Sequence, residues 1–321
     1  MLQKEFIVDG YERIIHIEHE ESGLDAFIVI HNTKLGPAIG GIRCHNYSNP
    51  EAQLDDTLRL SEGMTLKTAA AGLNHGGGKT TINALKIKDR SLAYQILGQA
   101  VEELKGSYIC AGDVGTTVED LFKVKDATKY VAGISLDSSL PTAFSTHTSI
   151  KTLLKRDGLK IQDQTFMVQG LGKVGKHLVK MLKGKIQAYD PFVSDLKGVT
   201  HVDETKILQG EFYVPCALGG VLNGFSLTSM KSKYVCGSAN NIFDTRDNII
   251  TAHDMGIKYV PDFITNCGGV VAVTLDYDKK DYKSALTTTL AKRINTILDI
   301  SKDENIPAQH AAERLANDRL K

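Results

Sequence analysis

Alternating apolar and polar residues mark the first predicted sheet of the chain. Between Glu12 and Pro37 the sequence reads "ERIIHIEHEESGLDAFIVIHNTKLGP", with apolar-rich runs on both sides of Ser22-Gly23. This pattern predicts two strands joined by a turn. His16 and His19 are three residues apart, so a strand does not place them on one face. We therefore expect the "HIEHE" run to form a solvated edge and not a metal site.

A helical spacing of apolar residues follows. Asn49 is a suitable N-cap, Pro50 suits the first helical position, and Gly72 is a suitable end. The apolar stripe of this predicted helix consists of Leu54, Leu58 and Met64. The sequence therefore predicts a helix over about 49–72, with Lys67 near its end.

Later segments show the same spacing. The runs 89–106 and 116–126 predict two more helices, and "SYICAG" between them is a short apolar run that leads into Asp113. After about Asp281 the chain is predicted to be helical, with Pro307 dividing two helices. From Thr165 onward short apolar runs alternate with helical segments, which is typical of a parallel α/β domain. We predict an α/β protein of two domains, with a change of pattern at residues 140–150.

Composition narrows the class of protein. The 321 residues are 42% hydrophobic and 24% charged, with 38 basic and 38 acidic side chains and a formal net charge of zero. This balance gives no general attraction to nucleic acid or to an anionic membrane. No stretch approaches the ~20 apolar residues of a membrane span, and the first residues contain no long apolar segment of the kind that a signal peptide needs. Five widely spaced cysteines fit free thiols, so we expect a cytoplasmic protein.

The segment "QTFMVQGLGKVGKHLVKMLKGKIQAYD" carries a dinucleotide-binding pattern. A predicted strand ends at Gln169, Gly170, Gly172 and Gly175 follow as G-x-G-x-x-G, and Asp190 ends the next strand. The glycines permit the turn, the approach to a pyrophosphate and close helix packing, while the helix start attracts phosphate. An acid at position 190 accepts ribose hydroxyls and repels a 2′-phosphate, which favours NAD over NADP. We predict a Rossmann-type, doubly wound domain over residues 141–285.

Other residues of this domain are expected to contact the cofactor. Lys173 and Val174 lie within the glycine motif itself. Three later loops, "PCALGG", "GSANN" and "NCGG", each follow a short apolar run, where loops at the carboxyl ends of parallel strands bind a cofactor. The residues predicted from the first two of these loops are Cys216, Ala217, Ala239 and Asn240.

The stretch "AGLNHGGGKTT" resembles a phosphate-binding loop but does not match one. The motif G-x-x-x-x-G-K-[ST] requires a glycine where the chain has Leu73. The first half nevertheless supplies Lys67, Lys79 and Asp113 among glycines. Combined with a nicotinamide-binding half, these groups indicate chemistry on a charged substrate.

Seven ordered motifs then resemble the amino acid dehydrogenases for glutamate, leucine, phenylalanine and valine, with leucine dehydrogenases the most similar. They are "LGPAIGGIR", "GMTLKTAAAGLNHGGGK", "AGDVGTTVEDL", "QGLGKVG", "VPCALGGVLN", "GSANN" and "PDFITNCGGVV". The resemblance implies an N-terminal α/β domain, residues 1–140 completed by 286–321, for substrate binding and oligomerisation. It also implies a cleft between this domain and the dinucleotide domain, and a homo-oligomer, either a dimer or an octamer.

The same resemblance implies a role for each charged group. Lys67 would pair with the substrate carboxylate, Lys79 would be the catalytic lysine, and Asp113 would carry protons. Gly40, Gly41 and Asn266 would hold the carboxylate end of the substrate, and Thr148 would lie near the nicotinamide. The glycines before Lys79 would let backbone and substrate come close. The implied reaction is NAD-dependent oxidative deamination of an L-amino acid to a 2-oxo acid, NADH and ammonia, and its reverse.

The side-chain pocket implied by the resemblance is apolar. Its residues are Ile39, Ala111, Val270 and Val273. An apolar pocket cannot compensate the burial of a carboxylate, so leucine, isoleucine and valine are favoured over glutamate. His75 and Gly112 depart from the leucine enzyme, which leaves an aromatic substrate, phenylalanine or tryptophan, as the alternative. A non-catalytic sensor of NAD or of an amino acid is a further alternative, which intact Lys67, Lys79 and Asp113 disfavour.

Overall fold

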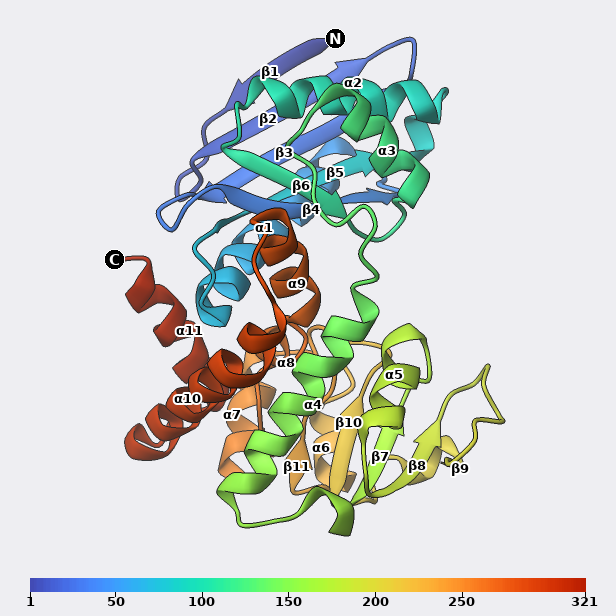
Figure 1. The fold of residues 1–321 in the computed structure, drawn as a ribbon, viewed down its shortest axis with the longest axis vertical. Coiled ribbons are helices and arrows are strands. Elements are labelled where there is room, and N and C mark those ends of the chain that lie inside the picture. Colours follow the sequence, from blue (N-terminus) through green and yellow to red (C-terminus); the bar gives the residue numbers. More distant parts are fainter. The chain divides into compact units, whose positions relative to one another are not determined.

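The computed structural model describes residues 1–321, and the chain divides into two compact units (Figure 1). The first unit comprises Met1–Leu136, Val273–Lys280 and Ala316–Lys321, and the second comprises Asp137–Ala272 and Asp281–Leu315. Of the predicted segment 286–321, therefore, only Ala316–Lys321 packs with the first unit. The reason is that helix α10 (Leu290–Glu304) packs on helix α4 (Ser139–Arg156), which is part of the second unit.

Six strands form the sheet of the first unit. They are β1 (Leu2–Phe6), β2 (Arg13–His19), β3 (Leu24–Asn32), β4 (Ala38–His45), β5 (Gly76–Asn83) and β6 (Tyr108–Gly112). Their order is β1-β2-β3-β5-β4-β6, antiparallel from β1 through β3 to β5 and parallel where β4 pairs with β5 and β6. The predicted strands around Ser22-Gly23 are β2 and β3, but β2 lies between β1 and β3, so "HIEHE" is not the solvated edge that we expected.

The helices of the first unit begin and end where the cap residues predict. Asn49 accepts a hydrogen bond from the Ala52 N–H at 2.8 Å at the start of α1 (Pro50–Ala71), and Gly72 ends it with a φ of 85°. Helix α2 spans Arg90–Glu103, and α3 spans Val118–Ala127 with Thr117 and Asp120 forming a capping box. A short 3₁₀ turn, η1 (Ala84–Lys86), follows β5.

The inner face of α1 differs from the predicted apolar stripe. Leu54 and Leu58 are only partly buried, whereas the most buried positions of its first four turns are Gln53, Thr57, Ser61 and Thr65. The Thr57 hydroxyl, for example, hydrogen-bonds to the Thr81 hydroxyl of β5 at 2.6 Å. Small side chains with paired hydroxyls let the helix lie closer to the sheet than a leucine stripe would. Apolar periodicity therefore located the helix correctly, and Leu54, Leu58 and Met64 do pack against buried clusters, but the most buried positions of the helix are polar.

Glycine makes this close packing possible. A Cβ built on Gly77 would lie 2.1 Å from the Thr65 N of α1, and one built on Gly76 would lie 1.8 Å from the Asn32 O of β3. Such distances are far below van der Waals contact, so no other residue fits without moving the helix or the strand. The glycines before Lys79 thus serve backbone packing, which the sequence did not predict.

The second unit contains a parallel sheet. Its strands are β7 (Thr165–Gln169), β8 (Lys185–Tyr189), β9 (Thr200–His201), β10 (Phe212–Pro215), β11 (Tyr234–Val235) and β12 (Lys258–Tyr259). Their order is β12-β11-β10-β7-β8-β9. Numbered from β7, this is the 3-2-1-4-5-6 order of the Rossmann fold, with its switch point between β7 and β10. The predicted doubly wound domain is confirmed.

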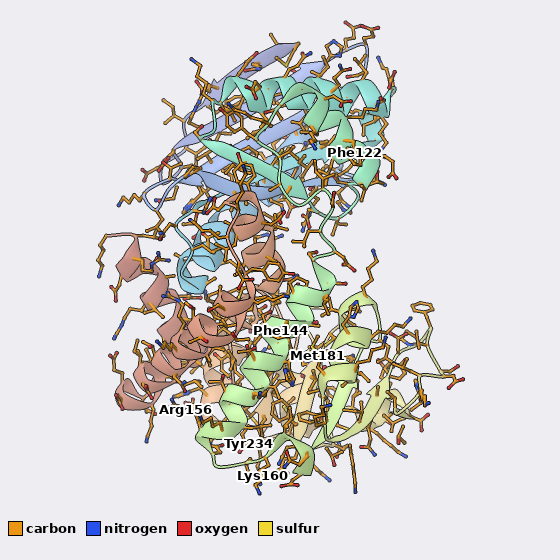
Figure 2. The ribbon with its side chains drawn as sticks, in the orientation of Figure 1. Phe122, Phe144, Arg156, Lys160, Met181 and Tyr234 are labelled. Carbon is orange, nitrogen blue, oxygen red and sulfur yellow. The ribbon has the colours of Figure 1, made fainter.

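Helices account for most of the remaining chain. Besides α4 and α10 they are α5 (Lys173–Met181), α6 (Gly224–Ser229), α7 (Arg246–Asp254), α8 (Asp262–Thr265), α9 (Gly268–Tyr277) and α11 (Ala308–Arg319). Short turns are the 3₁₀ segments η2 (Ile161–Asp163) and η3 (Glu204–Lys206) and the π-helical η4 (Ala285–Thr289). Arg156, labelled in Figure 2, joins α4 to α10 by donating to Asp299 at 2.7 Å. Pro307 separates α10 from α11, as predicted, and none of the helices is both long and apolar enough to cross a membrane.

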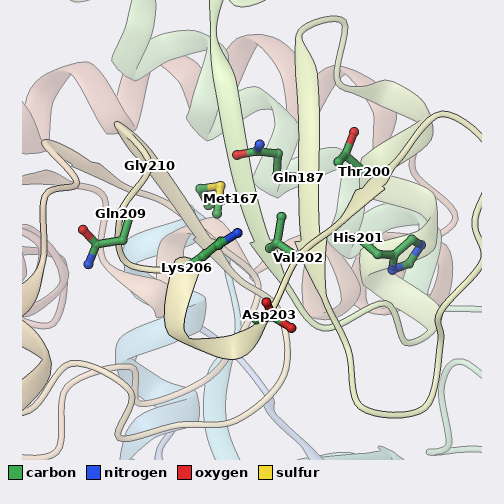
Figure 3. Close-up of a pocket in the computed structure, with 9 residues that line it drawn as sticks. All are labelled: Met167, Gln187, Thr200, His201, Val202, Asp203, Lys206, Gln209 and Gly210. Atoms are coloured by element: carbon green, nitrogen blue, oxygen red, sulfur yellow. The ribbon is translucent and has the colours of Figure 1, made fainter.

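One crossover of the second sheet lacks a helix. The chain passes from β8 to β9 and then to β10 with only η3 between them. A cavity of about 560 Å³ opens beside these strands, as Figure 3 shows. It is lined by Met167, Gln187, Thr200, His201, Val202, Asp203, Lys206, Gln209 and Gly210. Met167 pairs in register with Gln187, and Gln187 with Thr200, so these three share one face of the sheet.

The packing of α1 on β5 predicts a large cost for one added methyl group. We expect Gly77→Ala to lower the free energy of unfolding by about 3 kcal/mol or more, because its Cβ would overlap Thr65. Urea denaturation measures this change. The matched control is Gly63→Ala in α1, where a Cβ meets nothing within 4 Å. That variant should gain about 0.5–1 kcal/mol from helix propensity, and equal effects of the two substitutions would contradict the packing explanation.

Candidate functional site

Two of the predicted charged groups meet in the first unit. Lys79 lies on β5, and Asp113 directly follows β6. β4 lies between β5 and β6 and runs parallel to both, so β5 and β6 point the same way and can bring the two residues together across β4. The Lys79 Nζ donates to the Asp113 Oδ2 at 2.7 Å. The expected juxtaposition of lysine and carboxylate is present.

Burial controls the ionisation of this pair. Lys79 is 5% exposed, and burial lowers the pKa of its ammonium group, against the opposing attraction of Asp113. Burial alone would raise the pKa of Asp113, but the Lys79 ammonium and then the Arg43 guanidinium outweigh it and hold that pKa below its usual range. The lysine is therefore able to lose its proton more readily than an exposed lysine, beside a carboxylate that stays ionised.

Sequence reasoning missed a third charged member of this site. Arg43 on β4 donates from Nε to the Asp113 Oδ2 at 3.2 Å and from Nη1 to the Asp56 Oδ2 at 3.2 Å. Asp56 also accepts from the Tyr47 hydroxyl at 2.8 Å. The available signal was the position of Arg43 in "GGIRC", two residues after Gly41 and thus on the same face of the strand.

The predicted carboxylate-binding residues of the first unit lie on neighbouring elements. Gly40 and Gly41 are buried in β4, and a Cβ on Gly41 would lie 2.7 Å from the Asp113 Cβ. Lys67 is half-buried on α1, the helix that packs on β5. The role of each in holding a carboxylate stays a prediction.

An apolar cluster lies among the same strands. Ile39 and Ala111 belong to a buried cluster with Ile109 and Ala132, and Val273 packs against it. Met64 and Tyr277 complete its border. Three of the four predicted pocket residues, Ile39, Ala111 and Val273, are thus brought together. The fourth, Val270, is a half-buried residue on the part of α9 that belongs to the second unit.

His75 and Gly112, the two residues that depart from the leucine enzyme, lie close to other side chains of the first unit. His75 is 5% exposed, and its Nε2 lies 3.4 Å from the Asp278 Oδ1. Burial lowers the pKa of His75, although Asp278 acts in the opposite direction. The histidine is therefore packed and not solvated. Gly112 ends β6, and a Cβ there would lie 3.3 Å from the Leu121 side chain.

The glycine motif of the second unit leaves room for a phosphate. Gly170 has a φ of 101°, and a Cβ on Gly175 would lie 2.1 Å from the Gly170 O, so this glycine allows α5 to pack closely. A Cβ on Gly172, in contrast, meets nothing within 4 Å. Gly172 is also the N-cap of α5, and no side chain caps the helix there, so the first N–H groups of the helix, which include those of Lys173 and Val174, can donate to a ligand. The open space at Gly172 and the uncapped start of α5 can therefore accommodate a pyrophosphate.

Asp190 is held as an anion beside this loop. Its Oδ2 accepts from the Leu171 N–H at 2.6 Å, and its Oδ1 accepts from the N–H groups of Phe192 at 2.8 Å and Val193 at 3.1 Å. Partial burial would raise the pKa of Asp190, but these three donors outweigh it and lower the pKa. The carboxylate retains lone pairs that can accept ribose hydroxyls.

The later loops of the second unit are joined to one another. Cys216 and Ala217 follow β10 and touch the space above Gly170. The Asn266 Nδ2 donates to the Asn240 Oδ1 at 2.8 Å and lies 3.4 Å from the Ala239 O. The buried Asn266 Oδ1 has no hydrogen-bond partner within the protein. A buried acceptor of this kind is costly unless a ligand satisfies it, which supports a binding role for these loops.

Thr148 lies elsewhere on α4. It lines a cavity of about 660 Å³ between α4 and the segment η4–α10, together with Phe144, Thr152 and Ala291. A Cβ on Gly269, in the predicted "NCGG" loop, would instead lie 2.9 Å from the Thr142 Oγ1. The role of Thr148 near the nicotinamide stays a prediction.

Comparisons with known proteins identify the family. One family model, "Glu/Leu/Phe/Val dehydrogenase, dimerisation domain", matches residues 11–130. A second, "Glutamate/Leucine/Phenylalanine/Valine dehydrogenase", matches residues 183–320. The chain belongs to this family. The resemblance stated from its motifs is thus confirmed, and so is the enzyme class, an amino acid dehydrogenase that uses a nicotinamide cofactor.

Individual relatives differ in the substrate that they are named for. Leucine dehydrogenase of Bacillus subtilis strain 168 is 38% identical over 335 residues, which cover 97% of this chain and 91% of that protein. Phenylalanine dehydrogenase of Lysinibacillus sphaericus is 38% identical over 295 residues, 83% of this chain and 76% of its own length. The crystal structure of L-tryptophan dehydrogenase from Nostoc punctiforme superimposes with a TM-score of 0.86 at 33% identity, covering 97% of this chain and 96% of that chain.

The glycine motif predicts separable effects on binding and on stability. We expect Gly172→Ala to fold normally, because its Cβ has open space, but to weaken dinucleotide binding at least about tenfold, or ~1.4 kcal/mol. Titration with NADH, followed by its fluorescence, measures this loss. In Gly175→Ala the methyl group would overlap the Gly170 O, so the unfolding temperature should fall as well. A Gly172→Ala variant with unchanged affinity would show that phosphate does not approach this loop.

Proposed function

We propose that this enzyme catalyses the NAD-dependent oxidative deamination of branched-chain L-amino acids to 2-oxo acids, and the reverse reductive amination. The principal support is the buried Lys79–Asp113 pair, 2.7 Å apart, on the strands that also carry the apolar Ile39–Ala111 cluster. A proton-transfer pair beside an apolar cluster suits a substrate with a reactive α-carbon and an aliphatic side chain.

The proposed roles are those that the family resemblance implies, and the charge and burial of Lys79 and Asp113 are compatible with them. Lys67, with Gly40, Gly41 and Asn266, holds the substrate carboxylate. A nicotinamide bound to the second unit would supply the hydride acceptor for the α-carbon, which would convert the amine of the substrate to an imine. Lys79, with its lowered pKa, takes a proton from the water that attacks this imine. Asp113 carries protons to and from the nitrogen, and ammonia leaves.

The apolar cluster supports a branched-chain substrate. Ile39, Ala111 and Val273 offer no partner for a charged side chain, so a buried glutamate carboxylate would be uncompensated. Val270 is proposed to complete the pocket. Leucine, isoleucine and valine should all react, because one methylene changes binding by only ~1–3 kcal/mol.

An aromatic substrate is the second candidate. The similarity to a tryptophan dehydrogenase structure and to a phenylalanine dehydrogenase favours it. Opposing it, a Cβ on Gly133 would already lie 2.9 Å from the Val273 Cγ2, which indicates tight packing around this pocket residue.

The cofactor preference, assembly and location are proposed as follows. The carboxylate of Asp190 favours NAD, because it would repel a 2′-phosphate. The remaining proposed cofactor contacts are Gly170, Gly172, Lys173, Val174, Gly175, Cys216, Ala217, Ala239 and Asn240.

The first family model is described as a dimerisation domain, which supports a homo-oligomer, either dimer or octamer, with residues 1–140 and 286–321 taking part. Five free cysteines support a cytoplasmic location without nucleic-acid or membrane partners.

NADH formation with each of the twenty L-amino acids at alkaline pH tests the proposal. We expect activity with leucine, isoleucine and valine, and a loss of at least a hundredfold in kcat for Lys79→Ala and Asp113→Ala, since general acid–base groups contribute about 10²–10⁴-fold. Near-normal turnover in either variant would remove that residue from the mechanism. Greater activity with phenylalanine or tryptophan would instead establish the aromatic candidate.

Cofactor choice gives a separate prediction for Asp190. We expect Asp190→Ser to lower kcat/KM with NAD and to raise it with NADP, changing the ratio by about tenfold to a hundredfold, because one charge-assisted hydrogen bond and one repulsion are lost. Steady-state kinetics with both cofactors measure this ratio. Asp190→Asn is the control of similar shape without charge. If both variants keep the NAD preference, the carboxylate does not determine it.

A further inference from the structure

The charged array around Asp113 extends beyond the lysine that pairs with it. Arg43 reaches Asp113 with Nε and Asp56 with Nη1, both at 3.2 Å, and thus bridges two carboxylates. The Asp113 Oδ2 therefore accepts from two cations, Lys79 and Arg43.

The second carboxylate holds the arginine in place. Asp56, on α1, accepts from Arg43, from the Tyr47 hydroxyl at 2.8 Å and from Arg59 at 2.7 Å. Burial and then the hydrogen bond to Asp56 raise the pKa of Tyr47, so its hydroxyl remains a donor. The Arg43 and Asp56 side chains are only 24% and 18% exposed, so solvent screens the contact less than at the surface.

We infer that Arg43 is a positioning residue that sets the protonation and the orientation of Asp113, with Asp56 and Tyr47 fixing its guanidinium. The inference rests on the proposed function, in which Asp113 carries protons. It adds a residue to which neither the motifs nor the proposed mechanism gave a role.

The direction of the effect follows from the groups that face Asp113. They are Lys79 on β5, Arg43 on β4, Tyr108 on β6, and, through Arg43, Asp56 on α1 and Tyr47 after β4. Arg43 lowers the pKa of Asp113 and also that of Lys79. Removal of its charge should therefore raise both pKa values. Whichever group controls the rising limb of the pH–rate profile, that limb must move to higher pH.

Arg43→Met tests this inference, with Arg43→Lys as the conservative variant. We expect the rising limb of kcat/KM for Arg43→Met to move up by roughly one pH unit, the effect of one nearby charge, and kcat to fall on the order of tenfold with little change in KM. Arg43→Lys keeps the positive charge but can contact only one carboxylate, so its rising limb should lie closer to that of the native enzyme than to that of Arg43→Met. If Arg43→Met does not fold, Arg43→Lys alone tests the inference. A lowered kcat with a small shift of the rising limb to higher pH would support it, and a native kcat and pH profile would overturn it.

The matched control is Arg59→Gln. Arg59 binds the same Asp56 but is not bonded to Asp113, so its loss should leave the pH profile unchanged. A profile for Arg43→Met that superimposes on the native one, with only a lower unfolding temperature, would overturn the inference and leave Arg43 a structural residue.

Acid unfolding separates this inference from the proposed function. A carboxyl whose pKa is lowered on folding stabilises the protein above its unfolded pKa, and this contribution is lost as pH falls through the folded pKa. If the native enzyme oxidises no amino acid, the proposed function fails. The inference then stands only if Arg43→Met begins to unfold at higher pH than native protein and Arg59→Gln.

Discussion

The burial of one ammonium group on a central strand is the constraint on which the site depends. Lys79 lies on β5, between β3 and β4, in the part of the first unit from which water is most excluded. A buried cation without compensation would cost several kcal/mol, so the fold must supply an anion within hydrogen-bond reach. Asp113 does so, and the parallel pairing of β4 with both β5 and β6 is what brings it there. The topology of the sheet therefore places the two charged groups on which the chemistry of the site depends.

The second unit has features that suit the binding of an anionic cofactor, and few side chains are needed for them. An anionic cofactor needs backbone N–H groups, an open approach and one fixed carboxylate. The uncapped start of α5, the open space at Gly172 and the three N–H groups that hold Asp190 supply these.

Local patterns predicted much of this arrangement, because they report local physics. Cap residues placed the ends of α1, and the order strand, glycines, helix, strand, acid predicted the first half of the Rossmann sheet. Packing between distant segments was not predictable in the same way. The polar inner face of α1 became apparent only with β5 in place, since Thr57 and Thr81 are far apart in sequence. Arg43 was missed for the same reason: its partners Asp56 and Asp113 come from a helix and from another strand.

The missing crossover helix between β8 and β10 has a consequence for local order. Where most Rossmann strands are covered on both faces, Gln187 and Thr200 face a solvent-filled hollow, so this half of the sheet buries less apolar surface. Segments with few apolar contacts open at lower free energy than the core and exchange their amide protons sooner. Strand β8 also ends beside Asp190. We therefore expect the carboxylate that would hold the ribose to lie at the boundary between a slowly exchanging centre of the sheet and a margin that opens more readily.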